Sequence, residues 1–120
     1  YRFAQPAKLA RARLVFDSDL ERESCAGHPI MRRYPMLCNR SFGMEPFGFP
    51  KTMVRAFLIE CETAPGKWVE AARVSDNHQR LCRIPLDMAA SAIRFTPLET
   101  WGSAGAHLFA FDADSAVSAV

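Results

Sequence analysis

The fold is decided by residues 52–74, which read TMVRAFLIECETAPGKWVEAARV. In the first part of this stretch Met53, Phe57, Ile59 and Cys61 fall on one side of an extended chain, as the period of two in a β-strand requires. Apolar residues also occupy much of the other side, so this strand is predicted to be buried on much of both faces. Residues 64–67 (APGK) are typical of a turn, and residues 68–74 alternate again. Together they predict a β-hairpin.

The same alternation recurs on both sides of this hairpin. It predicts strands over residues 10–17, 80–86 and 106–112, with a further apolar signal at residues 1–3 before a break at Gln5-Pro6. Ile93 and Phe95 indicate a strand that ends near Pro97, and residues 87–92 are compatible with one helical turn. Six or seven short strands separated by turns predict an all-β fold, an antiparallel β-sandwich or jelly roll.

One long irregular insertion interrupts this pattern at about residues 21–50. Seven glycines and prolines between residues 26 and 50 exclude a long helix or a central strand there. We therefore expect a single sandwich domain over residues 1–113, with the insertion within it and a flexible tail over residues 114–120.

Charge and hydropathy favour no special partner. The 120 residues include 15 basic and 13 acidic ones, a net charge of +2, which gives no reason to expect nucleic acid or an anionic membrane. No apolar run approaches the roughly 20 residues of a membrane span. The chain opens on Tyr1 without a visible signal peptide, so secretion stays open.

Four cysteines, Cys25, Cys38, Cys61 and Cys82, show no spacing typical of a disulfide scaffold. Cys61 and Cys82 lie in apolar, strand-like stretches, where a free thiol behaves as a small hydrophobic residue. We expect reduced core cysteines, which favours a cytoplasmic protein, although a disulfide remains the alternative.

A resemblance to a known superfamily covers roughly residues 1–20 and 52–112. The segments that carry it are GKWVEAA at 66–72, AIRFTP at 92–97, TWG at 100–102 and AHLFAF at 106–111. They resemble a discoidin-like, galactose-binding-like jelly roll. More narrowly, LVFDSDL at 14–20 together with TWG is similar to the C-terminal domain of bacterial FAD-dependent oxidoreductases. The resemblance implies an accessory domain, with FAD in a parent protein.

The chain itself carries no sign of a cofactor or metal. Its glycines never form GxGxxG or GxxxxGK[ST], so no nucleotide-binding loop is predicted. Cys25, His28 and Cys38 offer three zinc ligands but no fourth, and no metal site is predicted from them. The acidic residues at 17, 19, 21 and 23 lack the spacing of a calcium loop and are interpreted as a solvated turn.

Candidate ligand-binding residues lie in the insertion and in one later loop. They combine planar guanidinium donors with aromatic or amide side chains, a set that suits a sugar or an anion: Arg32, Arg33, Tyr34, Asn39, Arg40 and Trp101. The favoured alternative for the insertion is an arginine-bearing loop folded over the sandwich. Trp101 would either stack on a sugar ring or close one end of the core. His107 is interpreted as a core or edge histidine with one satisfied nitrogen.

The sequence thus predicts a non-catalytic accessory or ligand-binding module of a larger protein. Its partners would be a parent catalytic domain or a carbohydrate-like ligand, and a free sheet edge would allow a homodimer. Two alternatives stay open: a carbohydrate-binding module, and a part of an enzyme that contributes side chains to the active site of a flavoprotein parent.

Overall fold

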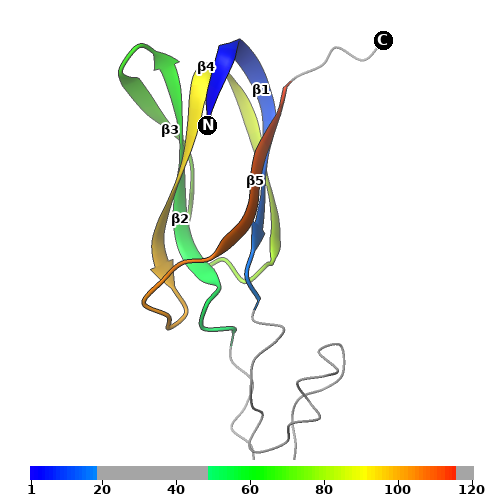
Figure 1. Ribbon diagram of the computed structural model, residues 1–120, viewed down its shortest axis with the longest axis vertical. Coiled ribbons are helices and arrows are strands. Elements are labelled where there is room, and N and C mark those ends of the chain that lie inside the picture. The colour runs from blue at the N-terminus through cyan, green and yellow to red at the C-terminus, as the bar shows by residue number, and fades with distance from the viewer. Residues whose placement is uncertain (19–48, 116–120) are drawn as a thin grey trace, which may run out of the picture.

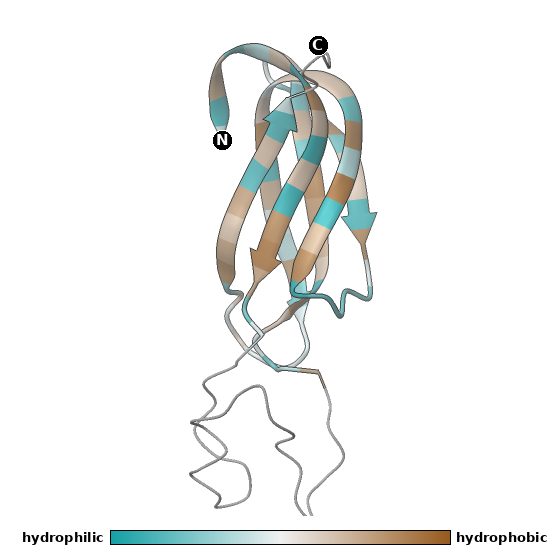
Figure 2. Cartoon of the chain, turned by 90° about the vertical axis from the view of Figure 1, so that its right-hand side faces the viewer, coloured by the Kyte–Doolittle hydropathy of each residue, from teal (hydrophilic) through white to brown (hydrophobic). Residues whose placement is uncertain are grey.

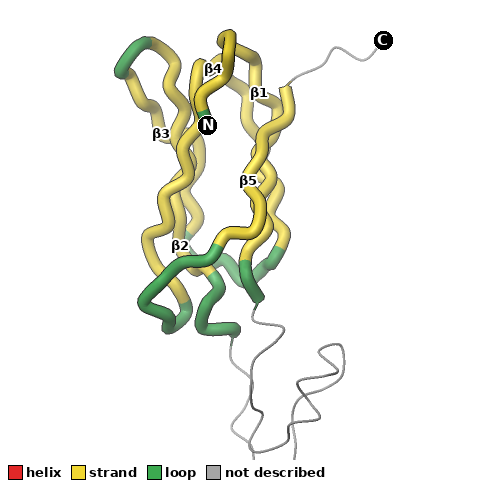
Figure 3. The backbone as a smooth tube through the Cα atoms, viewed as in Figure 1, coloured by secondary structure: helices red, strands yellow, loops and turns green. Residues whose placement is uncertain are grey.

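The structure is a computed structural model that describes residues 1–18 and 49–115, and the regular structure within them is entirely β-strand (Figure 3). The strands are β1 (Arg2–Phe16), β2 (Val54–Ala64), β3 (Lys67–Val74), β4 (Leu81–Thr100) and β5 (Leu108–Ser115). They form one antiparallel sheet in the order β3-β2-β4-β1-β5. The predicted all-β fold is therefore confirmed. Within the described ranges no helix could span a membrane.

The sheet becomes a sandwich because β4 bends near its middle. The first half of β4 pairs with β1, from Leu81 opposite Val15 to Ala90 opposite Ala7, and the second half pairs with β2. At the bend Ala92 is opposite residues of both neighbours. Figure 1 shows the result, with β3, β2 and the second half of β4 in one layer and the first half of β4, β1 and β5 in the other. The predicted antiparallel β-sandwich is confirmed.

Aromatic rings from both layers meet in the core. The Phe16 ring of β1 lies 5.3 Å from that of Phe57 on β2 and 6.0 Å from that of Phe95 on β4, and Phe95 lies 5.9 Å from Phe111 on β5. Hydrophobic and hydrophilic residues alternate along the strands (Figure 2), which places one face of each layer in the core. The buried cluster comprises Leu9, Ala12, Leu14, Phe16, Met53, Val54, Phe57, Ile59, Cys61, Cys82, Leu86, Ala90 and Ile93.

Three local predictions are wrong. Residues 87–92 are not a helical turn but the middle of β4, where pairing with β1 at Leu9–Met88 and Lys8–Ala89 overrides their local helical preference. The strand predicted to end near Pro97 runs to Thr100. Similarly, Pro6 does not break β1, because it lies where the β1–β4 register shifts between Arg2 and Ala7. The strands are consequently fewer and longer than predicted.

The β2–β3 hairpin is held by a buried carboxylate. Gly66 has a φ of 73°, a left-handed conformation that suits glycine, and its N–H donates to Glu62 Oε1 at 2.8 Å. The guanidinium of Arg2 lies 2.6 Å from Glu62 Oε2. The hydrogen bond from Gly66, followed by the contact with Arg2, lowers the pKa of Glu62 below its usual range, although burial opposes this shift. Ionised Glu62 thus links the hairpin to the amino end of β1.

This carboxylate makes stability depend on pH. Because the pKa of Glu62 is lower in the folded than in the unfolded chain, its contribution is present above the unfolded pKa and is lost as pH falls from about 5 through the lowered value. We expect Glu62→Gln to flatten the acid side of a curve of unfolding free energy against pH. Glu70→Gln, at an exposed carboxylate of the same hairpin, is the matched control. If the unfolding free energy of Glu62→Gln fell with decreasing pH as steeply as that of the wild type, this role of Glu62 would be contradicted.

The extent of the domain stays a prediction. Most of the insertion predicted at residues 21–50 lies outside the described residues, as does most of the predicted tail. Strand β5 includes residues 114 and 115.

Candidate functional site

One end of the sandwich gathers the loops that join its layers. It comprises residues 17–18, 49–53, 75–80 and 101–107, here called the loop end, at the bottom of Figure 1. Backbone hydrogen bonds join these loops: Trp101 N donates to Met53 O at 3.1 Å, Ser103 N to Lys51 O at 3.0 Å, and Phe16 N to Arg80 O at 2.7 Å. The loop end is therefore a connected surface supported by both layers.

Asn77 is the central polar residue of this end and is only 5 % exposed. Its side-chain nitrogen donates to Val54 O at 2.9 Å and to Gln79 O at 3.1 Å. Its side-chain oxygen accepts from Gln79 N at 3.1 Å and from Cys82 Sγ at 3.1 Å. Because buried polar groups need partners, these bonds fix the conformation of the loop over residues 75–80.

Trp101 is held in place by this loop. Its indole N–H donates to the backbone oxygen of Asn77 at 2.8 Å, and its ring packs against the edge of the core. The guanidinium of Arg55 lies 4.5 Å from the ring centroid, and the ring of Phe49 lies 4.4 Å from it. Other side chains therefore contact the Trp101 ring, and its role in ligand binding stays a prediction.

Phe49 is the aromatic ring that the loop end presents to solvent. It is 48 % exposed although it packs on Trp101, and its ring lies 5.9 Å from that of His78, which is also exposed. An aromatic side chain exposed to this extent and supported from below provides a flat apolar surface for a ligand.

Charged groups stand beside this aromatic surface. Arg55 lies 2.9 Å from Asp76 Oδ1 and 3.5 Å from Glu99 Oε1, so its guanidinium is positioned by two carboxylates while it covers Trp101. The group supplies planar N–H donors together with carboxylate acceptors, the two kinds of partner that hydroxyl groups use. Glu99 also lines a shallow hollow of about 520 Å³ between the end of β4 and the loop at residues 102–106.

The structure describes only one of the predicted ligand-binding residues. Trp101 lies at the loop end, whereas Arg32, Arg33, Tyr34, Asn39 and Arg40 lie outside the described residues, so their role stays a prediction. The same holds for the zinc interpretation of Cys25, His28 and Cys38. Within residues 1–18 and 49–115 no three His, Cys, Asp or Glu side chains are grouped to hold a metal ion.

The sequence also led to predictions for two cysteines and for His107. Cys61 and Cys82 are free and buried, as predicted, and burial raises the pKa of both thiols. His107 precedes β5 with its side chain 53 % exposed, and its Nδ1 lies 2.9 Å from Asp17 Oδ2. It is an edge histidine with one partnered nitrogen, not a core residue.

Sequence reasoning missed most of this site. Asn77 and His78 lie between the strands predicted at residues 68–74 and 80–86, where no functional residue is predicted, and Phe49 lies at the border of the predicted insertion. Their importance comes from contacts between segments far apart in the chain, such as Phe49 with Trp101. The one usable signal was an aromatic residue beside a glycine in a predicted loop, which identified Trp101.

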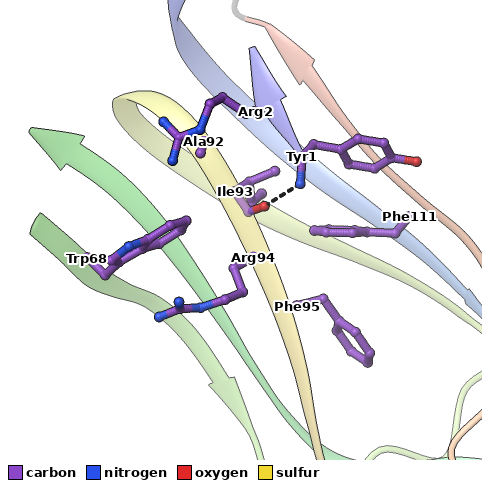
Figure 4. A pocket seen from close by; sticks show the side chains of 8 residues that line it. All are labelled: Tyr1, Arg2, Trp68, Ala92, Ile93, Arg94, Phe95 and Phe111. Carbon is purple, nitrogen blue, oxygen red and sulfur yellow. Dashed lines mark hydrogen bonds between the residues drawn. The ribbon is translucent and has the colours of Figure 1, made fainter. Parts of the chain in front are cut away.

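A second hollow lies at the side of the sandwich, away from the loop end. This side gap has a volume of about 420 Å³ and lies between Trp68 of β3 and Phe111 of β5, with β4 running through it (Figure 4). Its lining residues are Tyr1, Arg2, Trp68, Ala92, Ile93, Arg94, Phe95 and Phe111. The guanidinium of Arg94 lies 4.1 Å from the Trp68 ring centroid and 3.0 Å from Glu60 Oε1.

Comparison with known proteins supports the fold. No family model matches the chain, and no curated protein matches it. Among solved structures the chain is similar to the family 32 carbohydrate-binding module from Streptococcus pneumoniae EndoD, with a TM-score of 0.61 and 14 % sequence identity. The match covers 95 % of this chain and 66 % of that one, so the chain spans slightly less than two thirds of the module's length.

This likeness agrees with the antiparallel β-sandwich described above. At 14 % identity it establishes the fold alone. The finer resemblance to a domain of FAD-dependent oxidoreductases finds no support in the comparisons.

Proposed function

We propose that this chain is a non-catalytic carbohydrate-binding module and that its sugar ligand packs on Phe49 at the loop end. The observation that carries the proposal is the exposed Phe49 ring, stacked on Trp101 and flanked by Arg55 and its two carboxylate partners. The similar fold of a carbohydrate-binding module supports it.

The chemistry of this surface suits a hydroxyl-bearing ring. The C–H face of a sugar is apolar and gains from packing on an aromatic ring, whereas its hydroxyl groups both donate and accept hydrogen bonds. Phe49 supplies the first contact, Arg55 supplies donors, and Asp76 supplies an acceptor beside it. Since Asn77 fixes the surrounding loop, little conformational freedom would be lost on binding.

The proposal predicts that Phe49→Ala weakens sugar binding at least tenfold, about 1.4 kcal/mol. A glycan array on the 120-residue chain first identifies the sugar, and calorimetric titration of that sugar then gives the affinities. Phe109→Ala is the matched control, because Phe109 is 61 % exposed but lies on β5 outside the aromatic cluster.

The control should bind as the wild type does. A sugar that binds equally well to Phe49→Ala would exclude this surface, and a chain that retains no sugar on the array would reject the function itself.

A parent flavoprotein remains a separate hypothesis. The proposed module would be one part of a longer protein, and its sugar contacts would bring that protein to a glycan. The alternative in which this chain lends side chains to a flavin active site rests on the sequence resemblance alone. A thermal shift of the chain by FAD would favour that alternative over sugar binding.

A further inference from the structure

A further hollow lies on the outer face of the layer formed by β5, β1 and the first half of β4. Its volume is about 530 Å³, and it is here called the arginine hollow. The side chains that line it are Arg11 and Arg13 of β1, Arg83 of β4, and Asp112, Ala113 and Asp114 of β5. The three arginines are exposed, so their guanidinium groups are accessible to a ligand from solvent.

The register of the sheet places two of these arginines directly opposite each other. Arg13 of β1 is paired with Arg83 on β4 and, on its other side, with Asp112 on β5. Like charges that face each other across two strands repel, and this lowers the stability of the pair. The compensating carboxylate of Asp112 belongs to β5, which lies two strand spacings, or about 10 Å, from β4. It therefore compensates the charge of Arg13 better than that of Arg83.

Arg83 has no opposite charge of its own in the described part of the chain. No hydrogen bond or ion pair joins its guanidinium to another described residue. Arg13, by contrast, lies 2.5 Å from a carboxylate oxygen of Asp112. Arg11 lies 2.5 Å from one of Asp114. Three guanidinium groups thus face two carboxylates, which leaves the arginine hollow one positive charge in excess.

The two aspartates also orient the arginines of β1. Asp112 accepts hydrogen bonds from Nε and Nη2 of Arg13. Asp114 accepts from the same two nitrogens of Arg11. Each of these guanidinium groups keeps its third nitrogen, Nη1, without a hydrogen bond to any described residue. Because the bound carboxylates already restrict both side chains, less conformational entropy would be lost when Nη1 donates to a ligand.

We propose that the arginine hollow binds a tetrahedral oxyanion, the sulfate or phosphate ester group of a ligand. The group would pair with the planar fork of Arg83, which carries the uncompensated charge, and would accept a further hydrogen bond from Nη1 of Arg13. Its oxygens point in several directions, so one group can reach arginines on two neighbouring strands, whereas the two oxygens of a carboxylate are occupied by a single fork. A bound anion would also offset the repulsion between the two arginines.

The experiment is an NMR titration of the 120-residue chain at low ionic strength, where screening is weak. Sodium sulfate and sodium phosphate are separate probes, and sodium chloride at matched ionic strength is the blank. We expect saturable shifts at millimolar sulfate or phosphate, largest at the backbone amides of Arg13 and Arg83 and at the side-chain Nε–H of Arg83. Tighter binding of sulfate would indicate a sulfate ester as the natural group, and tighter binding of phosphate a phosphate ester.

Substitutions of Arg83 test the assignment. Arg83→Gln should weaken anion binding at least tenfold, because it removes a charge-assisted pair. The variant should fold as the wild type does, since Arg83 has no partner among the described residues. Arg83→Lys keeps the charge but not the fork and should weaken binding several-fold. Arg73→Gln is the matched control and should leave the affinity unchanged, because it removes the same charge from an exposed arginine on β3, in the other layer.

Three results would overturn the proposal. Equal weakening by Arg83→Gln and Arg73→Gln would reduce the effect to the overall charge of the chain. Wild-type affinity in Arg83→Lys would show that a point charge suffices and that no fork is used. Shifts that do not saturate, or that sodium chloride reproduces, would show that the arginine hollow holds no anion. The probes are inorganic ions and the arginine hollow is separate from the loop end, so this proposal stands or fails independently of the proposed function.

Discussion

Replacing Phe57 by alanine is expected to lower the free energy of unfolding by about 3–5 kcal/mol. Phe57 is fully buried on β2, and its ring contacts those of Phe16 and Phe95 at 5.3 and 5.7 Å. Truncation would remove the ring from the place where three strands of both layers meet and leave a cavity that the paired backbones cannot close. Urea denaturation followed by tryptophan fluorescence measures the change.

The size of this effect matters because small domains are stable by only about 5–15 kcal/mol. The control is Phe109→Ala, which removes the same ring from a position that is 61 % exposed and should change the unfolding free energy by less than about 0.5 kcal/mol. If Phe57→Ala cost no more than Phe109→Ala, the two layers could not be packed as described.

The β2–β3 hairpin could be predicted from sequence because its information is local. Alternation at Phe57, Ile59 and Cys61 identifies the buried face, and Pro65-Gly66 identifies the turn where Gly66 adopts its positive φ. Partner strands that are adjacent in the chain need no long-range information to find their register.

The bend of β4 could not be predicted in the same way. Residues 89–92 read AASA, and these small side chains give no contrast between a buried and an exposed face. In the structure Ala90, Ala92 and Ile93 are all buried, so the alternation changes phase within three residues as the strand passes from one layer to the other. Such a change is set by the strands on either side and is not encoded in the local pattern.

The ion pairs on the outer face of strands β1 and β5 also could not be predicted from the sequence. Arg13 pairs with Asp112 and Arg11 with Asp114 because the β1–β5 register places them opposite each other. The hydrogen bond between Arg13 and Asp112 raises the pKa of the arginine and lowers that of the aspartate. These pairs join residues about a hundred positions apart, so composition and net charge carried no sign of them. Exposed pairs of this kind contribute little to stability but disfavour other registers.

The candidate site was only partly predictable for the same physical reason. A tryptophan in a loop is compatible with either a ligand surface or a closed core end. The contacts of Trp101 with Phe49, Arg55 and Asn77 join segments that the sequence pattern alone does not bring together. In the sequence Ser75-Asp76-Asn77-His78 is a polar turn like any other. That one of its four residues is buried follows from how the loop crosses between layers.

Asn77→Ala is therefore expected to destabilise the protein by about 2–3 kcal/mol, more than an ordinary loop substitution. The change removes the donor for Val54 O and Gln79 O and the acceptor for Gln79 N. The lost bond to Val54 O is buried, and the two lost bonds to Gln79 are part-buried. Because the backbone of Asn77 also holds the Trp101 indole at 2.8 Å, the loosened loop should release the platform beneath Phe49.

Two readouts separate the global from the local effect of this substitution. Urea denaturation gives the loss of stability, and tryptophan fluorescence of the folded protein reports whether Trp101 becomes more exposed, with Trp68 as a constant background. Asp76→Ala, at the exposed neighbour, is the control for stability and should cost less than about 1 kcal/mol, because it removes only a surface ion pair with Arg55. Equal losses in the two variants would mean that the loop is held by its backbone and not by the Asn77 side chain. Sugar affinity is a separate measurement on the same two variants. It should fall in Asp76→Ala because an acceptor for the sugar is lost. It should fall in Asn77→Ala only if the Asn77 side chain organises the loop end.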